Sequence, residues 1–140
     1  MKKILFIAAV AFLGITSSFA QEGMDKLPAN VQELIKTNYA NLQIKKIKVD
    51  EGDMDERYKV KFENGTQLDF NSMGEINEID GEERIPDALI PQKIKNYLAT
   101  KYKGEYATEW EYENNVHEVE LSNGTELEFT DKGEILERKE

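Results

Sequence analysis

The sequence contains no cysteine and only one histidine, His117, in 140 residues. Without cysteine the chain has no disulfide, no catalytic thiol and no thiolate metal site. There is also no HExxH motif and no glycine-rich phosphate loop. An activated nucleophile with a partner base is therefore missing, and the sequence predicts a protein that is not an enzyme and whose stability depends on packing alone.

Long apolar runs are scarce as well, with one exception at the start of the chain. Lys2 and Lys3 precede an apolar run over residues 4–15, and the small residues Ser18 and Ala20 follow it. This pattern is typical of a secretory signal peptide, which we expect to be cleaved between Ala20 and Gln21. The run is short for a membrane-spanning helix, and no cysteine stands at the cleavage site to carry a lipid. We therefore expect a soluble protein that is periplasmic or secreted.

Basic side chains are in the minority, with 18 Lys and Arg against 28 Asp and Glu and a formal net charge of −10. Loss of Lys2 and Lys3 with the signal peptide would make the net charge more negative by two. Such a charge disfavours nucleic acid and anionic membranes as partners, and it favours cations or basic protein surfaces. Its simplest consequence is solubility.

Two stretches of the chain repeat each other. Residues 58–80 align with 117–139 at an offset of 59, and ten of these 23 positions are identical. Further upstream the offset is 63, because the first copy has four extra residues within the acidic stretch 50–57. The predicted organisation is a tandem repeat. Its parts are a signal peptide over 1–20, a short linker over 21–26, a first repeat over 27–80 and a second over 81–140.

Each copy is predicted to fold as a helix followed by four antiparallel strands. Pro28 and Pro91 precede apolar residues at helical spacing, and the alternating stretches 43–49 and 106–112 are typical of first strands. A three-residue turn ending at a left-handed glycine, such as Gly65, keeps the apolar residues of both flanking strands on one face. A two-residue Asn-Gly turn would not. The fold class is therefore α+β, with the helices on one face of the sheet.

The signal peptide, the "LP" or "IP" helix starts and the duplicated "YxVxFxNGTxLxFxxxGE" pattern resemble the PepSY-like, beta-lactamase-inhibitor-like (BLIP-like) family of periplasmic proteins. The resemblance covers residues 27–140. It implies tandem α+β repeats without a catalytic motif. It also implies a role in binding or inhibiting peptidases and, for some members of the family, regulation by calcium.

The outward face of the second repeat pairs like charges. The expected register places Glu118 opposite Glu128 and Glu120 opposite Glu126, whereas the first repeat pairs Lys59 with Asp69 there. Like charges directly opposite each other are destabilising. A basic protein surface would relieve them, although exposed glutamates also repel one another only weakly through water and salt. The candidate partner-binding residues are Glu109, Glu111, Glu118, Glu120, Glu126 and Glu128.

The acidic stretch 50–56 is the other candidate site. Asp50, Asp53 and Asp55 offer oxygen ligands, but their spacing does not match that of an EF-hand. A long hairpin loop kept in solution by its charge accounts for the stretch without a ligand. These three aspartates are weak candidates for a calcium site, and no other cofactor is expected.

Aromatic residues of the second repeat are expected to pack rather than to bind. Tyr106, Trp110 and Tyr112 share strand parity with the core, and His117 lies opposite Phe129 at the core margin. The sequence thus predicts a non-enzymatic exported binding module, an inhibitor or regulator of an exported protein such as a peptidase. The alternative is a calcium-responsive protein. The partner's identity, the oligomeric state and the continuity of the two sheets are left open.

Overall fold

The structure is a computed structural model that describes residues 23–139. The predicted signal peptide and its cleavage site lie outside the described residues. Within the stretch expected to be a linker, Met24–Lys26 form a 3-10 turn (η2), and the Met24 side chain is buried in the core.

Each repeat is a helix followed by four antiparallel strands, as predicted. In the first repeat these are α1 (Ala29–Asn38), β1 (Ile44–Val49), β2 (Tyr58–Phe62), β3 (Gln67–Phe70) and β4 (Ile76–Asp80). In the second they are α2 (Gln92–Lys101), β5 (Ala107–Glu113), β6 (Val116–Leu121), β7 (Glu126–Thr130) and β8 (Ile135–Lys139). A second 3-10 turn, η3 (Asp87–Leu89), lies in the connection between the repeats.

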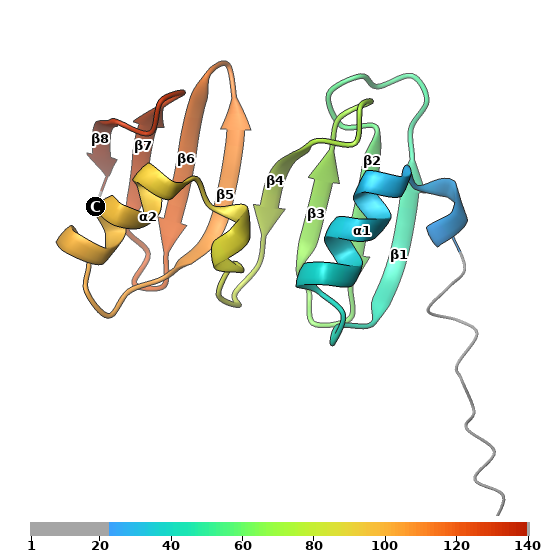
Figure 1. The fold of residues 1–140 in the computed structure, drawn as a ribbon, viewed down its shortest axis with the longest axis horizontal. Helices are drawn as coiled ribbons and strands as arrows, with labels where there is room; N and C mark the ends of the chain where they lie inside the picture. Colours follow the sequence, from blue (N-terminus) through green and yellow to red (C-terminus); the bar gives the residue numbers. More distant parts are fainter. Residues whose placement is uncertain (1–22, 140) are drawn as a thin grey trace, which may run out of the picture.

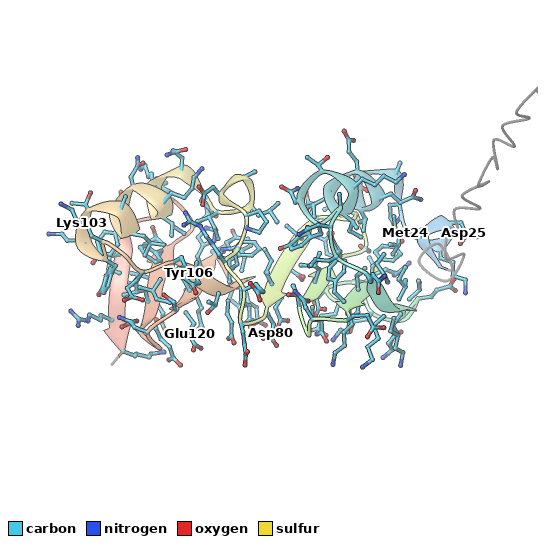
Figure 2. All side chains as sticks on the ribbon, turned by 90° about the horizontal axis from the view of Figure 1, so that it is seen from below. Met24, Asp25, Asp80, Lys103, Tyr106 and Glu120 are labelled. Carbon is cyan, nitrogen blue, oxygen red and sulfur yellow. The ribbon has the colours of Figure 1, made fainter. Side chains whose placement is uncertain are left out.

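The two repeats share one continuous sheet. Its eight described strands follow each other in sequence order, and every neighbouring pair is antiparallel. The repeats join where β4 pairs with β5, which sets Ile79 opposite Trp110 (Figure 1). Both helices lie on the same side of this sheet, so its other face is bare of helices (Figure 2). The fold thereby presents one long exposed sheet surface.

Glycine turns set the register that sequence parity predicted. Gly65 and Gly124 have φ values of +92° and +84°, a region that suits glycine because it has no Cβ. The N–H of Phe62 donates to the carbonyl of Thr66, and Val60 pairs with Leu68. The three-residue turn is therefore confirmed, and it keeps the apolar side chains of β2 and β3 together under α1.

The helices pack on the apolar face of the sheet. Val31 of α1 and Ile94 of α2 are fully buried, as are the strand residues Phe62, Phe70 and Phe129. Complete burial of one such side chain contributes about 1.5–3 kcal/mol to stability. The matched positions explain why both repeats keep the same apolar letters.

The aromatic prediction is confirmed for two residues and wrong for the third. Trp110 is buried, and its Nε1–H donates to His117 Nδ1 at 3.2 Å. Tyr112 packs partly buried against the core. Tyr106 is 37% exposed, because β5 begins after it and the strand is irregular between Ala107 and Glu109. This irregularity interrupts the alternation of faces, so the Tyr106 side chain does not share the core face with Trp110 and Tyr112 as the sequence predicted.

Candidate functional site

The helix-free face of the second repeat carries two rows of glutamates. Glu120 of β6 lies opposite Glu109 of β5 on one side and opposite Glu126 of β7 on the other. Glu118 is flanked in the same way, by Glu111 and Glu128. The two predicted pairs, Glu118 with Glu128 and Glu120 with Glu126, are therefore confirmed. Their role in binding stays a prediction.

The junction between the repeats extends these rows into the first repeat. Glu78 of β4 lies opposite Glu111 on one side and opposite Asp69 of β3 on the other. Figure 2 shows Asp80 of β4 and Glu120 on the side of the sheet away from the helices. We call the combined surface the acidic face. It consists of Glu78, Asp80, Glu109, Glu111, Glu118, Glu120, Glu126 and Glu128.

A shallow groove of about 150 Å³ runs over the acidic face, and all eight of its carboxylates line it. This volume is well below the roughly 300–1,000 Å³ typical of small-molecule pockets. The Lys139 side chain lies at one end of the groove and forms an ion pair with Glu128. The groove is thus suited to ions or to side chains from a docked surface rather than to an enclosed organic ligand.

Crowding of the carboxylates changes their acidity. Partial burial raises the pKa of Glu109 to about 7, with further contributions from the negative charges of Glu120 and Asp80. Burial also raises the pKa of Glu78 to about 7, assisted by Asp69 and Glu111. The pKa of Glu111 is raised for the same kinds of reason, burial first and then Glu118. The environment of these carboxyl groups in the folded protein therefore disfavours their ionised form, unless a positive charge lies nearby.

The other end of the same sheet surface is basic. Lys46, Lys48 and Lys61 are exposed on β1 and β2, with Lys48 opposite Lys59 and Lys46 opposite Lys61. Lys59 forms an ion pair with an acid, its Nζ lying 3.2 Å from Asp69 Oδ2. The surface therefore changes sign along its length, from β1–β2 to the acidic face.

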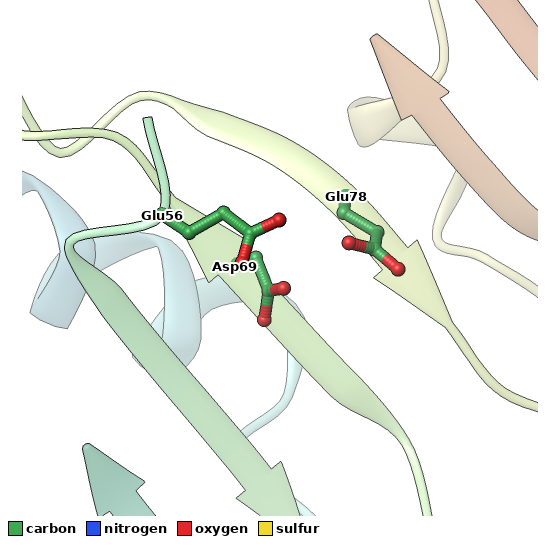
Figure 3. Close-up of side chains that lie close together, drawn as sticks. All are labelled: Glu56, Asp69 and Glu78. Atoms are coloured by element: carbon green, nitrogen blue, oxygen red, sulfur yellow. The ribbon is translucent and has the colours of Figure 1, made fainter. Parts of the chain in front are cut away.

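A second group of carboxylates, which we call the Asp69 cluster, consists of Glu56, Asp69 and Glu78. They come from the β1–β2 loop, β3 and β4, and one oxygen of each lies within 4.8 Å of the others (Figure 3). Asp69 is only 1% exposed although it points away from the helices. Sequence reasoning assigned no role to this cluster.

The β1–β2 loop holds itself together with its own aspartates. Asp53 Oδ1 accepts hydrogen bonds from the N–H groups of Glu56 and Asp55, both at 2.9 Å, and these bonds lower the pKa of Asp53. Asp50 Oδ1 accepts from the N–H of Gly52 at 3.1 Å. The side chains of Asp50 and Asp53, two of the three aspartates singled out from sequence, thus stabilise the loop that carries Glu56. Their role as metal ligands stays a prediction.

Comparison with known proteins places the fold in a family. The sequence matches the family described as "Putative beta-lactamase-inhibitor-like, PepSY-like" over residues 21–56 and 56–137. The chain belongs to this PepSY-like family. The resemblance inferred from the duplicated turns and core positions is therefore confirmed. None of the curated proteins matches the sequence.

Solved structures of relatives share the fold. A periplasmic protein of the DUF2874 family from Bacteroides vulgatus is 29% identical, with a TM-score of 0.75 over 84% of this chain and 93% of that one. A second B. vulgatus periplasmic protein, of unknown function, is 31% identical with a TM-score of 0.72, over 84% and 94% of the two chains. A Bacteroides thetaiotaomicron protein described as a "putative calcium-regulated periplasmic protein" is 28% identical, with a TM-score of 0.75 over 84% and 93%.

The localisation expected from sequence agrees with these relatives, which are described as periplasmic proteins. Within residues 23–139, no helix combines the length and the apolar character needed to cross a membrane. The PepSY-like family and its periplasmic relatives indicate a non-catalytic module.

Proposed function

We propose that this PepSY-like protein is a non-enzymatic exported module that binds a protein partner through its acidic face. The observation that carries the proposal is the assembly of eight carboxylates from four adjacent strands around one groove. Partial burial and mutual repulsion raise the pKa values of Glu78 and Glu109 to about 7, so a basic surface would gain energy by neutralising them. The partner is therefore an exported protein with a basic surface, and the family's description as beta-lactamase-inhibitor-like favours an enzyme under inhibition. A peptidase is the example that the sequence resemblance implies.

The site offers little to catalysis. His117 is buried, its Nδ1 accepts from Trp110, and its Nε2 lies 3.3 Å from the carbonyl oxygen of Asp131. Both ring nitrogens are thus engaged in packing contacts and face no nucleophile. This arrangement argues against a general-base role for His117.

The test is capture of partners from periplasmic extract by the purified protein. The key variant replaces Glu111, Glu118, Glu120 and Glu126 with Gln, which keeps size and removes four charges from the acidic face. The control replaces Lys46, Lys48 and Lys61 with Gln on the basic end of the same surface. We expect the glutamate variant to lose the captured protein and the lysine variant to keep it. Capture by the wild type should weaken in 0.5 M salt, where the Debye screening length falls to about 4 Å. Equal capture by wild type and the glutamate variant would show that this face is not the site.

We also propose, as a second candidate, a response to calcium. The specific observation in its favour is the Asp69 cluster, in which one oxygen from each of three carboxylates lies within 4.8 Å of the others. Oxygen atoms are the ligands that calcium prefers. The description of the B. thetaiotaomicron relative as calcium-regulated points the same way. Calorimetric titration with calcium at physiological salt tests it. Absence of heat, together with an unchanged melting temperature in millimolar calcium, would rule this function out.

A further inference from the structure

We propose that two copies of this chain associate face to face through their helix-free sheet surfaces, with the basic end of each copy lying on the acidic face of the other. The basic end consists of Lys46, Lys48, Lys59 and Lys61. The inference goes beyond the proposed function, because a second copy is an occupant of the acidic face that competes with any other partner. It uses only the charges of this chain, so it stands or falls separately from the capture of an exported protein.

Outward-facing residues form two rows across the sheet, and both rows change sign. The lysines of β2 alternate with the buried Val60 and Phe62, so they point away from the helices. In each row one lysine of β1 and one of β2 precede the residues of β3–β6. The first row consists of Lys48, Lys59, Asp69, Glu78, Glu111 and Glu118. The second consists of Lys46, Lys61, Gln67, Asp80, Glu109 and Glu120. The surface thus carries both sides of an electrostatic contact.

The order of the charges selects one arrangement of the two copies. A two-fold axis that lies between the facing sheets and runs parallel to the strands reverses the strand order of the second copy. With β1 over β6 and β2 over β5, each lysine of the basic end lies over a glutamate of the same row. The facing pairs, each present twice by symmetry, are Lys46 with Glu120, Lys48 with Glu118, Lys59 with Glu111 and Lys61 with Glu109. An axis perpendicular to the strands would instead set lysine on lysine.

The middle of this arrangement brings few like charges together. There β3 lies over β4 of the second copy, so that Gln67 faces Asp80 and Asp69 faces Glu78. Gln67 is neutral, and its side-chain amide can donate a hydrogen bond. The Asp69 side chain is 1% exposed and forms an ion pair with Lys59, so little of its charge reaches the facing sheet. The carboxylates of β7 lie outside the overlap.

The overlap is large enough for a weak dimer. Six strands of about five residues cover roughly 500 Å² per copy, at about 4.8 Å between strands and about 3.3 Å per residue. The total of about 1,000 Å² lies at the lower end for specific interfaces, where complexes are transient. The net charge of −10 on each chain opposes association at long range. At physiological ionic strength a Debye length of about 8 Å screens this repulsion more than it screens charges in contact.

The experiment is sedimentation velocity of the purified protein at physiological salt and about pH 8, over roughly 10 μM to 1 mM, a range that covers the affinity of transient dimers. The basic-end variant carries Lys46→Glu, Lys48→Glu and Lys61→Glu, and the acidic-face variant carries Glu109→Lys, Glu118→Lys and Glu120→Lys. The control carries Lys36→Glu, Lys101→Glu and Lys103→Glu, at exposed lysines on or just after the helices. We expect the wild type and the control to dimerise with similar affinity, and the dissociation constant of the other two variants to rise at least about tenfold.

An equimolar mixture of the two weakened variants is the decisive sample, because reversed residues face reversed residues at one end of the mixed dimer and native residues face native residues at the other. The mixture should dimerise within about threefold of the wild-type affinity. Three reversals change the net charge of −10 by six, so both variants stay negative and opposite net charges cannot explain this rescue. A wild type that stays monomeric at about 1 mM, a variant that dimerises like the wild type, or a mixture that stays monomeric would each overturn the proposal. If a charge-reversed variant fails to fold, the same positions are replaced by Gln, and unchanged dimerisation of that variant would overturn it.

Discussion

Stability of this protein should fall as pH rises from 5 to 8, and Glu109 should be one cause. The folded state raises the pKa of Glu109 to about 7, from an ordinary value of 4.5. Below pH 4.5 the carboxyl is protonated in both the folded and unfolded chains, so it carries no penalty. Above pH 7 it is ionised in both, and the folded state bears the full cost of its burial and of its neighbours Glu120 and Asp80.

The magnitude follows from the two pKa values. Taken at face value they correspond to about 3 kcal/mol, at roughly 1.4 kcal/mol for each factor of ten in proton affinity. Glu109 is only half-buried on an open sheet face, so solvent screening reduces this to about 1 kcal/mol. Glu109→Gln should therefore stabilise the protein by about 1 kcal/mol at pH 8 and leave it nearly unchanged at pH 5.

The assay is urea unfolding of wild type and Glu109→Gln at half-unit steps from pH 5 to 8, followed by far-UV circular dichroism. The difference between the two proteins isolates Glu109 from the other carboxyls. Glu63→Gln, at an exposed position in the β2–β3 turn, is the matched control and should show no pH-dependent difference. A Glu109→Gln protein that is less stable than wild type at pH 8, or whose advantage does not change with pH, would refute the reasoning.

Two further predictions concern the packing. Gly74→Ala should cost about 2 kcal/mol, because φ is +76° and a Cβ would lie 2.6 Å from Asn30 Oδ1, so that the Asn30 side chain must move and lose its hydrogen bonds to the carbonyls of Met73 and Gly74. Gly65→Ala, with open space around it, should cost only about 1 kcal/mol, and equal losses in urea unfolding would contradict this. Trp110→Phe should lower the free energy of unfolding by about 2 kcal/mol, because it leaves His117 Nδ1 without its hydrogen-bond donor. The double variant Trp110→Phe/His117→Phe should lose less stability than the sum of the two single losses, as measured by denaturant unfolding.

Much of the fold could be predicted from sequence because strand parity and glycine turns are local. The pairing of Val60 with Leu68 follows from alternation plus one left-handed glycine, and the structure has that pairing. The same local logic placed Glu118 opposite Glu128. Tyr106 was misplaced because a strand irregularity leaves no mark in an alternating pattern.

The part that could not be predicted depends on contacts between distant segments. Glu78 joins the acidic face only because β4 pairs with β5, and nothing in either strand specifies that edge as its partner. Asp69 in the stretch "QLDF" has the parity of an exposed strand residue. Its burial depends on a loop from another part of the chain, and loop paths are set by tertiary packing rather than by periodicity.

The distribution of differences between the repeats separates structure from recognition. Both copies keep the same glycines and core side chains, since each must bury a helix on a four-stranded sheet. They differ on the helix-free face, where Lys59 corresponds to Glu118 and Asp69 to Glu128. They differ again in the inserted loop, which covers Asp69 in one copy only. Neither difference is needed for the fold, because the other copy folds without it. The divergent carboxylates are therefore the positions at which selection for binding, rather than for stability, would act.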